Sequence, residues 1–187
     1  MGVVIVMNLS LRKNIPNRKE ASFTLVELLV VISIIGLLAG LGFPAISGAM
    51  KAGKKAEVAS MAESIKTAIN AFYAEYSTYP TNSSGAVLTN TDTNFLGVLS
   101  TTNTNGGNFR GISFLEVPPK FTNADGLVTP KGFYSGNGQS NFSILIDTQG
   151  AGTNIITVGT SKYTSPATIS VWVPDPSNSN KPVGTFK

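Results

Sequence analysis

The pattern of hydrophobic and polar residues divides the chain into a basic leader, a long apolar run, an amphipathic stretch and a polar C-terminal region. Residues 1–22 are a polar, basic leader with six apolar residues at its start, and Met7 offers an alternative start that gives a leader of 16 residues. Residues 28–50 are 23 consecutive uncharged positions. At about 1.5 Å per residue they span about 35 Å as a helix, enough to cross a hydrocarbon core of about 30 Å. The pattern predicts a transmembrane helix over residues 23–50.

Beyond Met50 the pattern becomes amphipathic. Apolar residues recur at spacings of three and four, as on one face of a helix, at Val58, Ala62, Ile65, Ile69, Phe72 and Tyr76. Pro80 cannot continue a helix, so the element is expected to end near Tyr79. Residues 51–79 are therefore predicted to continue the membrane helix, giving a single helix of roughly 85 Å over residues 23–79.

Residues 80–187 are rich in Asn, Thr, Ser and Gly and are predicted to be a loop-rich β region. Strand-like runs occur at 142–147, 155–159 and 168–173, with turn signals between the runs of apolar residues. We expect a small antiparallel sheet that covers the apolar stripe of the helix, and therefore an α+β fold. Segment 81–113 is expected to be mostly loop, with a short helix around residues 95–99. Trp172, on the last predicted strand, is expected to be a core or interface aromatic.

Charge and composition exclude several functions. Of the formal net charge of +4, residues 1–22 carry +3 and the remaining residues +1, so the body of the chain has no basic surface typical of nucleic-acid binding. The chain has no cysteine and no histidine, which removes disulfides, thiolate metal sites and the commonest general base. The acidic residues of the C-terminal region show no paired spacing, so we do not expect an enzyme.

The stretch from Ser22 to Ile32, SFTLVELLVVI, closely resembles the processing site of type IV prepilins and of type II secretion pseudopilins. The resemblance continues through Gly36 and through Pro44, which stands where the helix kink of the family falls. Residues 71–81, AFYAEYSTYPT, are similar to the helix end of G-type, or major, pseudopilins. The residue before the cut is usually Gly in the family and is Ser22 here, a residue still small enough for a narrow peptidase subsite. The absence of the paired cysteines of many type IV pilins favours the pseudopilins.

The resemblance implies a processing pathway and a set of partners. A prepilin peptidase would cut between Ser22 and Phe23 at the cytoplasmic face of the membrane and methylate the new amine of Phe23. The mature subunit would lie in the cytoplasmic membrane as a single-pass protein, with its N-terminus inside and its C-terminal region in the periplasm. It would then join other copies of itself and related pseudopilins in a filament, through a membrane assembly platform. The family role implied is type II protein secretion.

Glu27 is the only charged residue between Phe23 and Met50. A carboxylate at the centre of a membrane helix costs about 2.5–3.5 kcal/mol on insertion scales, and less near an interface. Such a group usually has a partner, and in the family the partner is the N-terminal amine of a neighbouring subunit. We expect Glu27 to set the register of assembly in this way; an interfacial Glu that reaches to headgroups is the alternative.

Two further features lie along the helix. Gly36 and Gly40 form a G-x-x-x-G pattern that permits close approach of another helix, or is simply tolerated in a membrane. Lys51, Lys54 and Lys55 directly follow the apolar run. Contact with lipid headgroups and pairing with an acidic residue of a neighbouring subunit both fit these lysines.

No cofactor is expected, with one exception to consider. G-type pseudopilins often hold calcium in a C-terminal loop, and here Asp175, Ser177 and Asn178 follow the last predicted strand and offer oxygen ligands. Only one of the three is charged, so a plain polar loop is the preferred interpretation.

Two other classes of protein fit the N-terminal pattern. An exported binding module could be cut by signal peptidase after Ser47-Gly48-Ala49, although the apolar run is longer than the 7–15 residues of a signal sequence. An uncut anchor holding a periplasmic domain is the third interpretation. The three classes predict different N-termini: Phe23 for a pilin, Met50 for an exported module and the leader start for an anchor. Within the pilin class, a secretion pseudopilus and a pilus for adhesion, motility or DNA uptake both stay open, as do major and minor subunits.

Overall fold

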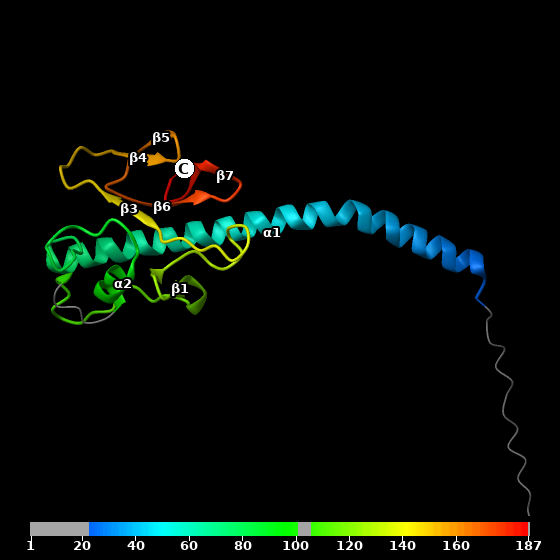
Figure 1. The fold of residues 1–187 in the computed structure, drawn as a ribbon, viewed down its shortest axis with the longest axis horizontal. Helices are drawn as coiled ribbons and strands as arrows, with labels where there is room; N and C mark the ends of the chain where they lie inside the picture. Colours follow the sequence, from blue (N-terminus) through cyan, green and yellow to red (C-terminus); the bar gives the residue numbers. More distant parts are fainter. Residues whose placement is uncertain (1–22, 101–105, 187) are drawn as a thin grey trace, which may run out of the picture. The chain divides into compact units, whose positions relative to one another are not determined.

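The computed structural model describes residues 23–100 and 106–186 (Figure 1). The chain divides into two compact units, one ending at Pro44 and the other running from Ala45 to Lys187. Helix α1 (Leu25–Tyr76) contributes to both units, and the other described elements belong to the second. The leader, residues 1–22, lies outside the described residues.

Helix α1 begins two residues later and ends three residues earlier than the sequence predicted. At its end, Ser77 adopts a left-handed backbone conformation with φ 55°, while its N–H still donates to the Tyr73 carbonyl at 2.7 Å. A residue in this conformation ends the helical repeat, so the expected end at Tyr79 is wrong. Tyr79 instead folds back, and its ring stacks on that of Tyr73 at a centroid distance of 4.6 Å.

The described residues of the C-terminal region form a short helix and three antiparallel sheets in place of the single sheet predicted. Helix α2 (Thr93–Ser100) confirms the expected short helix and is followed by the 3₁₀ helix η2 (Pro119–Phe121). The strands are β1 (Thr122–Asn123), β2 (Gly126–Leu127), β3 (Ser143–Ile146), β4 (Asn154–Val158), β5 (Ser161–Ser165), β6 (Ile169–Asp175) and β7 (Asn178–Gly184). They pair in the orders β1-β2, β3-β6-β7 and β4-β5.

The three predicted strands correspond to β3, β4 and β6, whereas β5 and β7 were not predicted. Both missed strands are polar, and β7 contains Pro182, which is tolerated because this strand pairs on one side only, with β6. Trp172 of β6 is half-buried and contacts Phe186 edge-on, with ring centroids 6.0 Å apart. It is therefore a partly covered aromatic on the central strand of the three-stranded sheet.

One hydrophobic core joins the second half of α1 to α2, to the β1–β2 hairpin and to the three-stranded sheet. The predicted stripe provides its helical side: Val58, Ala62, Ile65, Ile69 and Phe72 are buried, and Tyr76 is packed against the core. Residues of the three-stranded sheet, including Ile144, Val171 and Val173, provide the opposite side. In Figure 1, β3 and β6 run alongside the C-terminal part of α1. The structure confirms the α+β fold and the burial of the stripe.

A glycine in the first hairpin allows β2 to lie against the start of α2. Gly126 has φ 112°, and an added Cβ would lie 2.4 Å from the carbonyl carbon of Asp92. The adjacent Leu127 N–H donates to the Thr91 carbonyl at 2.9 Å, which fixes this approach. The position therefore requires glycine for both conformation and space.

We predict that Gly126→Ala lowers the free energy of unfolding by more than about 2 kcal/mol. The cost of an alanine at positive φ and the cost of the clash with the Asp92 backbone add to each other. Gly85→Ala is the matched control, since Gly85 has φ 80° with no atom within 4 Å of an added Cβ. Its cost should be about 1 kcal/mol. Denaturant unfolding of the full chain in detergent, followed by Trp172 fluorescence, measures both, and equal costs would contradict the role of the close approach.

Candidate assembly site at the start of helix α1

Glu27 lies in the first turn of α1, and its carboxylate is held by Thr24. Glu27 Oε2 accepts hydrogen bonds from the Thr24 N–H and from the Thr24 hydroxyl, both at 2.8 Å. The Glu27 N–H in turn donates to Thr24 Oγ1 at 3.2 Å. Thr24 directly precedes the first helical residue, so the two residues form a reciprocal capping box. The carboxylate also lies at the positive end of the helix dipole.

Thr24 is a site residue that was not predicted, although the sequence contains its signal. A Ser or Thr followed three residues later by Glu, just before an apolar run, is the pattern of a capping box. The pattern explains why the helix begins at Leu25 and not at Phe23. It also means that Oε2 of Glu27 already accepts two hydrogen bonds within its own chain.

The apolar side chains around Glu27 are exposed along the first unit. The exposed fraction of its large hydrophobic residues ranges from 45% at Val31 to 78% at Leu25. Such a continuous apolar surface is unfavourable in water and requires lipid or other apolar helices around it. Among the described residues, α1 is the one helix long and apolar enough to cross a membrane, a test that a signal sequence near the N-terminus also passes.

The other predicted residues of this segment lie as follows. An added Cβ at Gly36 or Gly40 would meet no atom within 4 Å, so close helix approach at these glycines stays a prediction. Pro44 lies inside α1, and the boundary between the two units directly follows it; a kink there also stays a prediction. Phe23 is 72% exposed and precedes the helix, while Ser22 lies outside the described residues.

The candidate calcium ligands lie at the turn between β6 and β7, where their oxygen atoms already have partners. Asp175 Oδ2 accepts a hydrogen bond from Lys55 Nζ at 2.8 Å, and Asp175 Oδ1 accepts one from the Ser177 N–H at 2.7 Å. Asn178 Oδ1 accepts from the Asn180 N–H at 3.1 Å. A single carboxylate paired with an ammonium group does not suit calcium, which prefers several oxygen ligands with net negative charge. The residues present do not fit a calcium site.

Asp175 instead ties the sheet to α1. The Lys55 and Asp175 side chains are 32% and 13% exposed, so their pair is partly shielded from solvent. Burial raises the pKa of Asp175, but the Lys55 ammonium and the Ser177 N–H together outweigh it, and the pKa lies below its ordinary value. Close by, burial and the charge of Asp175 raise the pKa of Tyr134 to about 12. The Tyr134 hydroxyl therefore stays protonated at neutral pH and donates to the Pro174 carbonyl at 2.9 Å.

We predict that Asp175→Asn lowers the free energy of unfolding at neutral pH by about 1 kcal/mol. Because the pKa of Asp175 is depressed in the folded protein, its contribution is present above the ordinary value of 3.8 and is lost as the pH falls through the lower folded value. The difference between wild type and variant should therefore shrink in acid. Asp125→Asn is the control, because Asp125 is exposed and forms no ion pair within the described residues. A difference that persists in acid would contradict the ion pair.

Comparisons with known proteins find matches to part of this chain. Residues 17–43 match the family model described as the prokaryotic N-terminal methylation motif. The chain is 34% identical over 77 residues to the fimbrial protein of Neisseria meningitidis serogroup A, which is 41% of this chain and 45% of that protein. It is 33% identical over 70 residues to a type IV major pilin protein PilE1 of Neisseria gonorrhoeae, which is 37% of this chain and 42% of that one.

The similarity to these relatives is partial. The chain spans less than half the length of the curated relatives it matches, and no solved structure matches it. The matched segment includes Phe23, Thr24 and Glu27, the residues of the capping box and of the expected cut. The methylation motif, the similarity to Neisseria pilins and the α+β fold with its long N-terminal helix support a type IV pilin-like prepilin.

Proposed function

We propose that this chain is the precursor of a structural subunit of a type IV pilus-like filament. The observation that carries the proposal is the environment of Glu27: a carboxylate in the first turn of α1, at the start of a helical segment whose large apolar side chains are exposed up to Met50. A helix of this kind is suited to burial among copies of itself, because each copy offers the same apolar surface.

The chemistry proposed at the N-terminus requires processing by a prepilin peptidase. Cutting between Ser22 and Phe23 would release an amine on Phe23, next to the Thr24 N–H that holds Glu27. N-methylation of Phe23 preserves the charge of that amine. In the filament, the Glu27 carboxylate would exchange the donors of Thr24 for the amine of a neighbouring subunit. A match of opposite charges in apolar surroundings then selects one axial register, because any other register leaves the amine and the carboxylate without an opposite charge nearby.

Before assembly, the mature subunit would span the cytoplasmic membrane through residues 23–50. Its N-terminus would lie on the cytoplasmic side and its second unit in the periplasm. The assembly platform of the apparatus and related pilin-like subunits would be its partners. We propose a structural role without catalysis for this chain.

The use of the filament has two candidates. Type II protein secretion is the first, on the resemblance of residues 71–81 to G-type pseudopilins. A pilus is the second, favoured by the relatives that are named fimbrial proteins and type IV major pilins. Deletion of the gene separates the two: retention of exported proteins in the periplasm indicates secretion, and loss of surface filaments with normal secretion indicates a pilus.

We predict that Glu27→Gln reduces filament assembly at least tenfold while leaving the subunit folded. Glutamine keeps the capping box, since it can still accept from Thr24, but it removes the charge that the neighbouring amine needs. Sheared filaments are quantified against total membrane-bound subunit.

Glu116→Gln is the matched control, because it makes the same change at an exposed position of the second unit. It should assemble as wild type. Wild-type filament yield from Glu27→Gln would show that the charge of Glu27 has no role in assembly.

A further inference from the structure

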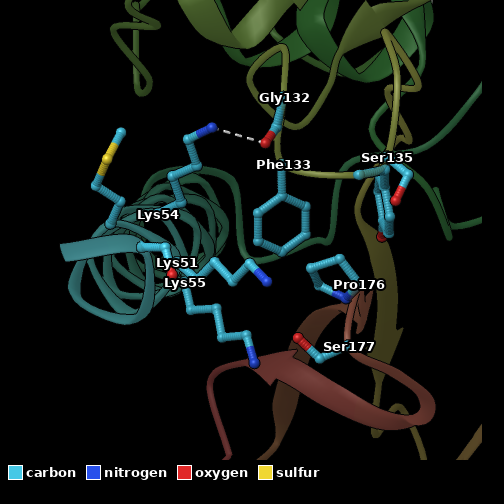
Figure 2. Close-up of a pocket in the computed structure, with 11 residues that line it drawn as sticks. Lys51, Lys54, Lys55, Gly132, Phe133, Ser135, Pro176 and Ser177 are labelled. Atoms are coloured by element: carbon cyan, nitrogen blue, oxygen red, sulfur yellow. Dashed lines mark hydrogen bonds between the residues drawn. The ribbon is translucent and has the colours of Figure 1, made fainter. Parts of the chain in front are cut away.

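A basic cleft lies beside α1, just beyond the apolar run. It has a volume of about 480 Å³ and is formed by residues 47–55 of α1, residues 132–135 and the turn between β6 and β7. All three segments belong to the second unit. Figure 2 shows the lysine side chains leaving α1 toward the other two segments. A cleft of this size suits a small molecule or a lipid headgroup.

The cleft has an excess of positive charge. Lys54 Nζ donates to the Gly132 carbonyl at 2.8 Å, and Lys55 pairs with Asp175. Lys51 is exposed and forms no ion pair within the described part of the chain. Three ammonium groups therefore face one neighbouring carboxylate, and the least engaged of them, Lys51, is available to an anion.

The other walls of the cleft are apolar or aromatic. Met50 is 61% exposed at its edge, and the rings of Phe133 and Tyr134 lie edge to face with centroids 4.9 Å apart. A site with ammonium groups on one side and apolar or aromatic groups on the other resembles the environment at a membrane interface, where amphipathic aromatic residues are enriched.

The position of the cleft along the chain indicates that the anion it binds is a lipid phosphate. Met50 is the last residue of the uncharged run, and Lys51, Lys54 and Lys55 follow within one and a half helical turns, or about 7 Å along the axis. The headgroup layer on each side of a bilayer is about 5–7 Å thick. If the apolar run fills the hydrocarbon, as the proposed function requires, the three lysines lie at the depth of the lipid phosphates.

We infer that this cleft binds the phosphate of an anionic phospholipid in the leaflet through which α1 leaves the membrane. Lys51 and Lys54 hold the phosphate, while Met50, which is exposed at the edge of the cleft, contacts the glycerol and the start of an acyl chain. Lys55 stays with Asp175 and keeps the wall formed by the β6–β7 turn in place. The bound lipid would hold the second unit at the surface of the bilayer until the subunit enters a filament.

The test is a titration of the full-length protein in detergent with short-chain phosphatidylglycerol, followed by native mass spectrometry. Lys51→Gln should weaken binding about fivefold, the effect of one lysine at a charged membrane surface. Lys162→Gln is the matched control, because Lys162 is exposed on β5 and does not line the cleft. This control should bind as wild type. Equal binding by wild type and Lys51→Gln would overturn the inference.

Two further titrations separate the sources of the anion. Short-chain phosphatidylcholine should bind more weakly than phosphatidylglycerol, and inorganic phosphate should not compete at equal concentration. Effective competition by inorganic phosphate would show a site for free phosphate and overturn the lipid assignment. A second result would also overturn the lipid assignment: Lys51→Gln binds lipid as wild type does but no longer crosslinks to other subunits. That result would indicate that Lys51 pairs with an acidic residue of a second copy.

The lipid site rests on the proposed function, because it requires that α1 is inserted in a membrane. A failure of membrane insertion can be distinguished from a failure of the lipid site. Alkaline extraction of membranes releases the chain if α1 does not span the bilayer, which is a failure of the proposed function. A chain that resists extraction but shows no effect of Lys51→Gln refutes the cleft alone.

Discussion

The constraint on which the rest of the molecule depends is the exposed apolar surface of the first half of α1. Burial of one large aliphatic side chain is worth about 1.5–3 kcal/mol, and many such side chains are exposed between Leu25 and Met50. In the proposed pathway the bilayer covers this surface first and neighbouring helices cover it later. Transfer between the two surroundings need not expose it to water. Glu27 is the one residue that distinguishes these surroundings, because lipid offers no partner for its charge whereas an assembled neighbour would.

The capping box gives this carboxylate an intermediate partner. Thr24 supplies two donors to Glu27 Oε2, so the charge is already hydrogen-bonded before any neighbour arrives. Exchange of Thr24 for an ammonium group replaces hydrogen bonds from uncharged donors with an ion pair between opposite charges, which is stronger in apolar surroundings. In the proposed pathway, the capping box would lower the cost of placing the acid in the membrane and leave a further gain in free energy on assembly.

The second unit covers the apolar face of the other half of the same helix, so that this half is compatible with water. Its core covers one face only, from Val58 to Phe72, and leaves the opposite face polar. Polar ties complete the attachment: Lys54 bonds the Gly132 carbonyl, and Lys55 pairs with Asp175. These ties join parts of the chain that are far apart in sequence and hold the loops that form the basic cleft.

Much of this organisation could be predicted from the sequence because it depends on local periodicity. The spacing of Val58, Ala62 and Ile65 identified the buried face, and the apolar β-branched runs identified β3, β4 and β6. The end of the helix could not be placed from the sequence. A left-handed residue after a helix is usually glycine, but here this residue is Ser77. The strands β5 and β7 were missed because most of their polar residues have low intrinsic β-propensity. These residues form strands because they pair with β4 and β6.

The candidate site was predictable in part for the same reason. Glu27 stands out because a lone charge in an apolar run is a local signal, and the Thr24 cap had a local signal that was overlooked. The pairing of Lys55 with Asp175 had none, since the two residues are 120 positions apart. The oxygens of Asp175 that the sequence offered to a metal accept hydrogen bonds from an ammonium group and a backbone N–H, and the preferred interpretation, a plain polar loop, stays a prediction.

The most direct test of the central claim is the intact mass and N-terminal sequence of the protein from membranes of cells with an active prepilin peptidase. The account predicts a chain that begins at N-methylated Phe23. A chain that begins at Met50 would contradict it and indicate an exported module, and a retained leader would indicate a plain membrane anchor.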